Sequence, residues 1–404
     1  MNQFSPNVSP SVSPSGSPSA VSGLADAHPK RVRYVMIGGF LGAGKTTSIL
    51  RYASWLVARG LRVGLVTNDQ AGGLVDTALA AAHDLAVEEI AGGCFCCRFT
   101  SLVEAAEALV HDSAPDVLLA EPVGSCTDLV ATVSLPLEQI YGDRFTVAPV
   151  SVVVDPLRAA KVLGLDGGAQ LSAHVGYIYR KQLEEAEIIV LNKCDLVAPE
   201  QRARLREALA AVAPRARVFE GSARDGAGLE PWFEALLAER STASAIAEID
   251  YDRYALGESL LGWLNLEARI VARDGDDFDG NRLLVEVMEA IRGRLQASGH
   301  EIAHLKATLA VEGDPYELAA ANLVRTAAQP ELSHRLAEPI DIGRLLLNLR
   351  AEADPALLDE AVRGALAALP ILAGPDGGCD VEILHAEHFR PGRPVPTHRL
   401  TALS

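Results

Sequence analysis

The sequence predicts an α/β fold class, a doubly wound domain with a mainly parallel sheet followed by a smaller α+β domain. Residues 39–46 read Gly-Phe-Leu-Gly-Ala-Gly-Lys-Thr and fit the phosphate-binding pattern G-x-x-x-x-G-K-[ST] at every required position. From residue 31 to about 240, short continuous apolar runs alternate with helix-like stretches, as expected for parallel strands buried on both faces. We therefore expect a P-loop NTPase domain at 31–240.

Composition narrows the class of protein. The chain has 404 residues, which favours two domains, and a net charge of -17, which argues against a nucleic-acid partner and against anionic membranes. No run of about eighteen consecutive apolar residues is present, so no spanning helix is expected. Three of the six cysteines lie within four positions, which indicates metal or redox chemistry in a reducing compartment. A cytoplasmic location is the expectation.

Residues 1–30 are rich in Ser and Pro and predict a disordered tail. Strands in the first domain are predicted, in order, at 34–37, 63–67, 117–120, 150–154, 188–191 and 218–219. Because ligands of doubly wound sheets bind at the carboxyl ends of the strands, polar residues at those ends are the candidates for function.

The phosphate-binding loop has the context that its pattern requires. The apolar run 34–37 precedes it and a helix-like stretch, 47–56, follows it. Backbone N–H groups of the loop and the helix N-terminus would bind phosphate. Lys45 would reach the terminal phosphates and Thr46 would ligate Mg²⁺. The predicted phosphate-binding set is Gly39, Gly42, Ala43, Gly44, Lys45, Thr46 and Thr47.

The base would be read by a second motif. Residues 192–195, Asn-Lys-Cys-Asp, follow a strand and match N-K-x-D. The Asp195 carboxylate can accept two hydrogen bonds from the N1 and N2 edge of guanine, and adenine lacks that donor pair. Backbone N–H groups of Ser222 and Ala223 would meet guanine O6. The pattern thus predicts binding of GTP through Asn192, Lys193 and Asp195, with a simple polar turn as the alternative.

Two further strand ends would sense the γ-phosphate. Residues 121–124, Glu-Pro-Val-Gly, stand where GTPases usually have D-x-x-G, so Gly124 would sense the phosphate and Glu121 would contact Mg²⁺ through water. Asp69, after the second strand, would also approach Mg²⁺. Ordinary polar strand ends are the alternative for both acids. The predicted catalytic set is Lys45, Thr46 and Glu121. No glutamine follows Gly124 to orient water, which predicts slow hydrolysis without a metal or partner.

The cysteine cluster is the second anchor. Residues 92–98 read Gly-Gly-Cys-Phe-Cys-Cys-Arg, and three thiols freed by two glycines can converge on one soft cation. Zn²⁺ and Co²⁺ accept such ligation by Cys94, Cys96 and Cys97. Arg98 would lower the thiol pKa values. A redox pair and packing cysteines are the alternatives.

The second half has a different pattern. Residues 241–249 read as a linker, and 250–370 predict a small α+β domain in the order β-α-β-β-β-α. Its predicted strands are 264–271, 305–311, 323–327 and 345–349, and its helices lie near 284–295 and 354–369. The tail, 371–404, is predicted to be loop-like. It carries Cys379, His385, His388 and His398, which are either metal ligands or surface and packing groups.

Residues 31–240 resemble the CobW-type P-loop GTPases, whose marks are the phosphate loop, C-x-C-C, E-x-x-G in place of D-x-x-G, and N-K-x-D. This chain has all four in the family order, and Glu89 stands five residues before Cys94 as the family places it. Asp69 is a departure, because the family more often has glutamate there. The family includes metallochaperones and metal-enzyme activators for zinc, cobalt or cobalamin, nickel, and nitrile hydratase metals.

The resemblance implies GTP-dependent delivery of a transition metal to a client metalloenzyme. Residues 250–254 and 261–265 resemble a branch found beside corrinoid methyltransferases, so a client of corrinoid methyltransferase or nitrile hydratase type is the expectation. Two other functions stay open: a GTP-gated metal sensor without transfer, and a small-molecule kinase. The guanine motif argues against the kinase.

Overall fold

The structure is a computed structural model that describes residues 31–68, 85–90, 92–167, 171–242, 246–273, 277–369 and 378–401. The predicted tail at 1–30 and the predicted magnesium ligand Asp69 lie outside the described residues. Residues 31–404 form one compact unit, which contains both predicted folded domains.

The first sheet confirms the predicted fold class. Its strands are all parallel, in the order β3-β2-β4-β1-β6-β7-β8, and the short β5 pairs with β1. The chain builds outward from β1 on both sides, so the loop after β1 lies where ligands bind in such sheets. The strands are β1 Val32–Gly38, β2 Val63–Asn68, β3 Ala86–Ile90, β4 Val117–Glu121, β5 Phe145–Val147, β6 Ser151–Val154, β7 Ile188–Leu191 and β8 Arg217–Glu220.

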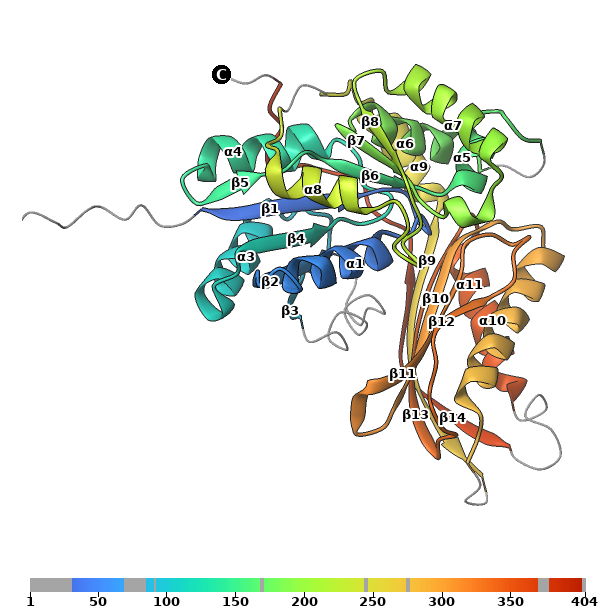
Figure 1. Cartoon of the computed structure of the whole chain (residues 1–404). Helices are drawn as coiled ribbons and strands as arrows, with labels where there is room; N and C mark the ends of the chain where they lie inside the picture. Colours follow the sequence, from blue (N-terminus) through green and yellow to red (C-terminus); the bar gives the residue numbers. More distant parts are fainter. Residues whose placement is uncertain are drawn as a thin grey trace, which may run out of the picture. The chain divides into compact units, whose positions relative to one another are not determined.

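Helices cover both faces of this sheet (Figure 1). Tyr34 and Met36 of β1 pack in the core that includes residues of α3, α6 and α7, whereas Val35 and Ile37 pack in the core with α1 and α8. This two-sided burial explains why the strand reads as a continuous apolar run. The helices are α1 Lys45–Val57, α3 Phe99–Ser113, α4 Leu135–Tyr141, α5 Pro156–Val162, α6 Ala173–Glu184, α7 Pro199–Val212, α8 Glu230–Ala238 and α9 Tyr251–Leu260.

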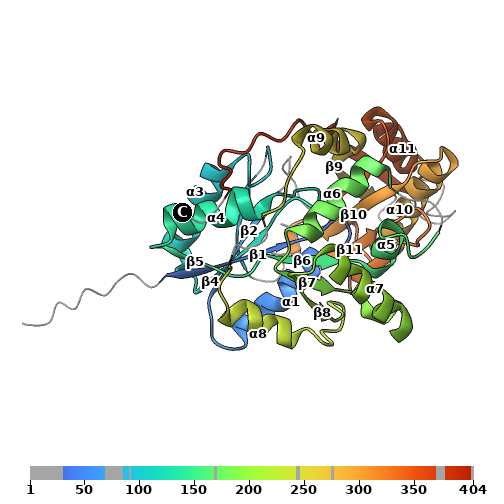
Figure 2. The same ribbon diagram turned by 90° about the horizontal axis from the view of Figure 1, so that it is seen from above.

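The second sheet is antiparallel, in the order β12-β11-β10-β13-β9-β14, and α10 and α11 pack on one of its faces (Figures 1 and 2). The Asp354 side chain caps α11, and Pro355 fills its first turn, as the sequence indicates. The elements are β9 Gly262–Ala272, α10 Gly280–Ala297, β10 Ile302–Val311, β11 Asp314–Leu323, β12 Glu331–His334, β13 Ile342–Ala351, α11 Pro355–Ala367 and β14 Cys379–Phe389.

Two predictions about this half are wrong. The strand predicted at 323–327 is the end of β11, which runs from Asp314 to Leu323. The tail predicted to be loop-like contains β14, which pairs antiparallel with β9 along its length. β14 lies at the sheet edge and alternates charged residues such as Asp380 and Glu382 with partly buried ones. An edge strand of this kind lacks the apolar run by which buried strands are recognised.

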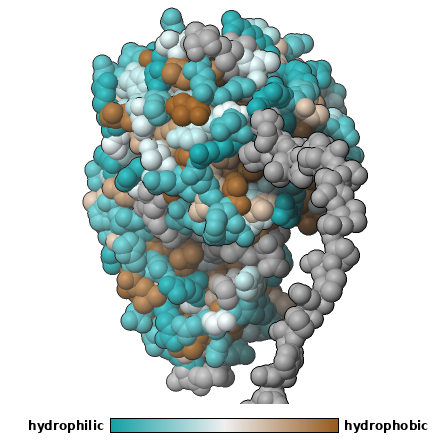
Figure 3. Space-filling view, turned by 90° about the vertical axis from the view of Figure 1, so that its left-hand side faces the viewer, coloured by the Kyte–Doolittle hydropathy of each residue, from teal (hydrophilic) through white to brown (hydrophobic). Residues whose placement is uncertain are grey.

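On the face drawn in Figure 3, hydrophobic side chains form small separate spots among hydrophilic residues. Within the described part of the chain, no helix has the length and apolar character needed to cross a membrane.

A buried acid at the end of α6 predicts a pH-dependent stability. Burial, reinforced by the charge of Asp128, raises the pKa of Glu185 to about 8. Its carboxyl group accepts hydrogen bonds from the Thr127 hydroxyl and the Val130 N–H, at 3.0 and 3.2 Å. Between its ordinary pKa and about 8, the unfolded chain ionises this acid while the folded chain keeps it neutral. Stability should therefore fall as pH rises through that window.

Glu185→Gln mimics the neutral acid and should flatten this dependence, measured as the difference in melting temperature between pH 5 and pH 8. Glu184→Gln, the exposed neighbour that pairs with Lys181, is the matched control and should leave the difference unchanged. An unchanged difference in Glu185→Gln would contradict the assignment.

Candidate nucleotide and metal site

The loop between β1 and α1 has the backbone that its glycines predict. Gly39 has φ +132°, and a Cβ there would lie 2.3 Å from the Val153 carbonyl oxygen. Gly44 has φ +96°, and a Cβ there would lie 2.4 Å from Asn192 Nδ2. Only glycine fits these two positions. α1 begins at Lys45, directly after the loop, so its N-terminus faces the site of the expected phosphates.

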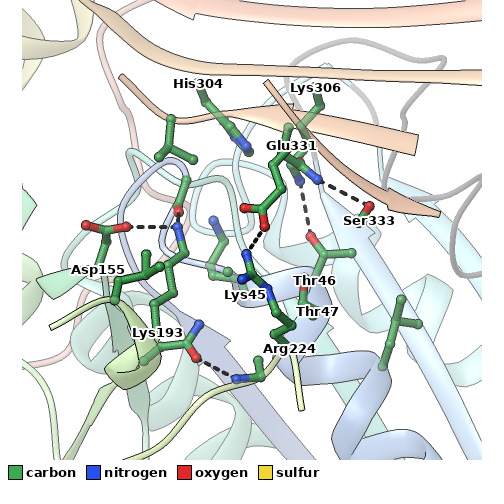
Figure 4. A pocket seen from close by; sticks show the side chains of 18 of the residues that line it. Lys45, Thr46, Thr47, Asp155, Lys193, Arg224, His304, Lys306, Glu331 and Ser333 are labelled. Carbon is green, nitrogen blue, oxygen red and sulfur yellow. Dashed lines mark hydrogen bonds and ion pairs between the residues drawn. The ribbon is translucent and has the colours of Figure 1, made fainter. Parts of the chain in front are cut away.

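A cavity of about 570 Å³ opens beside this loop (Figure 4). It brings together most of the predicted residues: Gly42, Gly44, Lys45, Thr46, Thr47, Glu121, Asn192, Lys193, Asp195 and Ala223. Gly124 lines a smaller adjoining cavity with Lys45 and Glu121. Gly39, Ala43 and Ser222 do not line the cavity. Gly39 and Ala43 are part of the backbone of the phosphate loop.

The phosphate end of the cavity holds hard oxygen donors beside a lysine. The Thr46 hydroxyl donates to Glu121 Oε1 at 3.0 Å, and Lys45 Nζ lies 3.9 Å from the same oxygen. A hydroxyl and a carboxylate are the ligands that Mg²⁺ prefers, so Thr46 and Glu121 fit the predicted magnesium site. Two of the three predicted magnesium ligands, Thr46 and Glu121, therefore lie side by side, and the third, Asp69, is outside the described residues.

At the other end, the N-K-x-D residues tie the two loops together. Asn192 Nδ2 donates to the Ala43 carbonyl at 2.9 Å, and Asn192 Oδ1 accepts from the Ala223 N–H at 2.8 Å. Lys193 Nζ donates to the Gly42 carbonyl at 2.7 Å and to Asp155 Oδ2 at 2.8 Å. Asn192 and Lys193 therefore set the position of the phosphate loop relative to the base-reading segment.

The predicted guanine contacts are only partly in place. Asp195 lines the cavity and lies 3.5 Å from Arg224 Nη1. The Ser222 N–H, however, donates to the Ala227 carbonyl at 2.9 Å, and the Ala223 N–H donates to Asn192. Both predicted donors to guanine O6 are engaged within the protein, so contact with a base requires them to exchange partners.

The C-terminal sheet contributes residues that sequence reasoning missed. Lys306 of β10 donates from Nζ to Thr46 Oγ1 at 3.1 Å, and Glu331 of β12 pairs with Arg224 (Figure 4). His304 is buried beside them. Burial, together with the charges of Lys306 and Lys45, holds the pKa of His304 well below its usual range, so the ring is neutral at pH 7.

The lining carries an excess of positive charge, which suits an anionic ligand. Six lining side chains are cationic and four are anionic. The cations are Lys45, Arg51, Lys193, Arg224, Lys306 and Arg325, and the anions are Glu121, Asp155, Asp195 and Glu331. Opposite charges near a triphosphate strengthen its binding in a partly enclosed site.

The three predicted thiols converge. Their sulfurs lie within 4.8 Å of one another, with Cys94 at 2.7 Å from Cys96 and at 3.2 Å from Cys97. Among the described residues, these three cysteines are the one group of three or more Cys, His, Asp or Glu side chains close enough to hold a metal ion. All six cysteines are free thiols.

The thiols of the cluster shift one another's pKa values in opposite directions. Hydrogen bonds from neighbouring thiols, that of Cys126 foremost, hold the pKa of Cys94 well below its usual range. The same bonds raise the pKa of Cys96, and that of Cys97 to about 11. The predicted role of Arg98 is therefore wrong, because the shift comes from thiols, and Arg98 Nε instead donates to the Gly92 carbonyl at 3.1 Å.

The tail histidines do not join this cluster, but the tail backbone does cover it. The Val395 N–H donates to Cys97 Sγ at 3.3 Å, and the Thr397 N–H donates to the Cys96 carbonyl at 2.8 Å. His398 packs edge-on against Phe99. His388 lies 3.9 Å from Asp359 on the second domain. In the described residues, the tail therefore contacts the cysteines through its main chain.

Asn68, the last residue of β2, holds the cysteine loop. Its Nδ2 donates to the carbonyls of Ile90 and Gly93 at 3.0 and 2.7 Å, and its Oδ1 accepts from the Phe95 N–H at 2.9 Å. Asn68 is also the residue before Asp69, which is predicted to approach Mg²⁺. A strand end next to the nucleotide site is thereby bonded directly to the thiol loop.

Asn68→Ala should lower the free energy of unfolding by at least about 2 kcal/mol, because it leaves buried backbone groups without partners. It should also weaken metal binding by spreading the thiols. Thermal denaturation and metal titration measure the two effects. Asn322→Ala, which removes a long 3.5 Å contact with Ser333, is the control. Wild-type metal affinity in Asn68→Ala would show that the loop holds its shape without this side chain.

The residues that form this site are similar in sequence to known proteins. Residues 33–220 match the family model described as "CobW/HypB/UreG, nucleotide-binding domain". This part of the chain is a nucleotide-binding domain of the CobW/HypB/UreG family. The matched residues include the phosphate loop, the three cysteines, Glu121 and the N-K-x-D residues. The resemblance inferred from the four motifs is confirmed.

Two curated relatives match over the same region. The zinc chaperone YeiR of Escherichia coli is 31% identical over 174 residues, which are 42% of this chain and 49% of the relative. The zinc chaperone CobW of a Sinorhizobium species is 29% identical over 195 residues, or 43% of this chain and 54% of the relative. The matched region spans about half the length of these two proteins.

Two solved structures show a weaker similarity. HypB of Archaeoglobus fulgidus is 22% identical, with 51% of this chain and 89% of that chain covered and a TM-score of 0.36. The Zn(II)-bound YjiA GTPase of E. coli is 15% identical, with 84% of this chain and 99% of that chain covered and a TM-score of 0.35.

Proposed function

We propose that this protein is a GTP-binding and GTP-hydrolysing metallochaperone that carries Zn²⁺ or Co²⁺ on Cys94, Cys96 and Cys97 and delivers it to a client. The observation that carries the proposal is the bonding of Asn68, at the end of β2, to the cysteine loop. The same sheet edge holds Thr46 and Glu121 of the nucleotide cavity. One conformational change at that edge would act on both sites.

GTP would bind with its phosphates at the loop and at Lys45, and with its base near Asp195. Mg²⁺, held by Thr46 and Glu121, would neutralise charge on the β- and γ-phosphates. Lys45 would bind the phosphate oxygens, and Gly124 lies next to it, since a Cβ there would be 3.0 Å from Lys45 Nζ. A backbone N–H at that place can respond to the γ-phosphate.

Hydrolysis would then change the metal affinity. With GTP bound, the strand ends that carry Asn68 and Gly124 hold the thiols together. Loss of the γ-phosphate loosens them and favours release. Because coupling between two sites is reciprocal, the metal must change nucleotide affinity by the same factor. Hydrolysis is expected to be slow unless metal or a client accelerates it.

Zinc is the favoured cargo. The thiolate set suits both Zn²⁺ and Co²⁺, and both curated relatives are named zinc chaperones. The client is a metalloenzyme, for which corrinoid methyltransferase and nitrile hydratase types are the first to test.

The test is a competitive titration of the full chain with Zn²⁺ and Co²⁺, in Mg²⁺ with GDP or with a non-hydrolysable GTP analogue. We expect one-to-one binding that is tighter with the analogue and is lost in Cys96→Ser. Cys379→Ser, which removes a buried thiol of the second domain, is the control.

Transfer of bound Zn²⁺ to an apo client on addition of GTP separates a chaperone from a sensor. Tight, nucleotide-dependent binding with no transfer would identify a GTP-gated sensor. Metal binding that ignores both the nucleotide and Cys96 would overturn the proposal.

A further inference from the structure

A fourth thiol contacts the cysteine cluster from another part of the chain. Cys126 lies 29 residues beyond Cys97 and is buried, at 2% exposure. It packs in the same buried core as Cys94 and Cys96, and the interaction of its thiol with that of Cys94 is the largest cause of the lowered pKa of Cys94. Cys126 lies in the turn after β4, two residues beyond Gly124. Four sulfurs therefore gather where the C-x-C-C pattern alone predicts three.

The sulfur geometry fits a tetrahedral ion. Structural zinc sites of the Cys₄ type have Zn–S distances of about 2.3 Å, which places the sulfurs roughly 3.8 Å apart. The three clustered sulfurs lie 2.7, 3.2 and 3.7 Å apart, so they would spread slightly around an ion. The Cys126 sulfur lies outside the group of three sulfurs that are all within 4.8 Å of one another, so it must move inward to complete the set.

Residues 121–124, which are predicted to sense the γ-phosphate and are named the nucleotide switch, are tied to Cys126. Buried Gln182 of α6 donates from Nε2 to the Gly124 carbonyl at 3.0 Å and to the Cys126 carbonyl at 2.7 Å. One buried side chain thus links the Gly124 and Cys126 carbonyls. Gly124 in turn lies against Lys45 at the phosphate site.

We propose that Cys126 is the fourth metal ligand, and that Cys94, Cys96, Cys97 and Cys126 together form a four-sulfur site completed by the nucleotide switch. The inference rests on the proposed function and deepens it. Each thiol that binds the ion releases its proton to solvent. The γ-phosphate draws Gly124, and with it Cys126, toward its binding position, so the triphosphate state has four sulfurs and the diphosphate state has three.

The same segment also contacts α9, which connects to the second domain. The Thr127 N–H donates to the Tyr254 hydroxyl at 3.3 Å, and the Ser125 hydroxyl donates to Glu258 at 3.2 Å. Both partners lie on α9, the helix that leads into β9. A client that engages the second domain would thus act on the fourth ligand through α9.

The test is a Co²⁺ titration of the full chain without oxygen, in Mg²⁺ with GDP or the GTP analogue. The sulfur-to-cobalt charge-transfer band grows with the number of Co–S bonds. Wild type should show four bonds with the analogue and fewer with GDP. Cys126→Ser should show three in both states. With the analogue it should bind Co²⁺ at least about tenfold more weakly than wild type, since even outer-shell partners of ligands contribute that much, and with GDP its affinity should match wild type. Cys379→Ser should match wild type.

X-ray absorption at the zinc edge of Zn²⁺-loaded wild-type protein with the GTP analogue counts the ligands without any substitution. Four sulfurs are expected, and three sulfurs with one nitrogen or oxygen would overturn the proposal, whether or not Cys126→Ser folds. A wild-type band and affinity in Cys126→Ser, with binding lost in Cys96→Ser, would overturn the fourth ligand alone. Unchanged binding in Cys96→Ser would instead overturn the proposed function itself.

Discussion

Lys306→Ala is expected to weaken binding of a non-hydrolysable GTP analogue by about 10- to 100-fold, the range for loss of one hydrogen bond to a charged group. Lys306 comes from β10 of the second domain, yet its Nζ lies 3.1 Å from the hydroxyl of Thr46. An ammonium group at that place would meet the terminal phosphates beside Lys45. GDP, which has one phosphate fewer, should be affected less.

Lys306→Arg keeps the charge and should retain most of the affinity for the analogue. Lys181→Ala removes a partly buried lysine of α6 that pairs with Glu184, away from the nucleotide cavity, and is the control. Calorimetric titration with GDP and with the analogue measures both affinities. Equal losses for the two nucleotides, or none, would show that Lys306 holds the two domains together without sensing the third phosphate.

Asp195→Asn is expected to reverse the base preference. The change removes the carboxylate that would accept from guanine N1 and N2, which should lower GTP affinity by about 10- to 100-fold. The asparagine amide can donate to the second carbonyl of xanthine, so xanthosine triphosphate should bind better than GTP. In the structure, Asp195 Oδ2 lies 3.5 Å from Arg224 Nη1, and Asp195 lines the cavity.

Competition of GTP and xanthosine triphosphate against a fluorescent guanine nucleotide measures this change of base preference. Asp112→Asn, on the exposed end of α3, is the control and should leave the base preference unchanged. Retained GTP preference in Asp195→Asn would mean that the base is read by other groups of the cavity.

Much of the nucleotide site was predictable because its parts are contiguous. The phosphate loop needs glycine at particular backbone angles, the helix follows at once, and the N-K-x-D residues follow a strand, so each piece is specified by neighbours in the chain. The same holds for the thiols at 94–97. Parallel strands bring their carboxyl ends to one edge, and this places the separate pieces together.

The second domain was less predictable. Its alternating pattern at 305–311 indicated a strand with one wet face, which includes Lys306, but the pattern does not say which surface that face covers. β14 was missed because its edge position lets charged residues alternate with apolar ones, and its pairing with β9 is a tertiary contact.

Short-range backbone geometry and residue chemistry suffice to predict the α/β class, the phosphate loop, the guanine motif and the thiol triad. The tertiary structure alone decided that Lys306 meets Thr46, 260 positions away, that Cys126 meets Cys94, and that the tail backbone covers the cysteines. Those contacts depend on how domains and loops pack. Periodicity shows which face of an element is buried, but packing selects the partner that buries it.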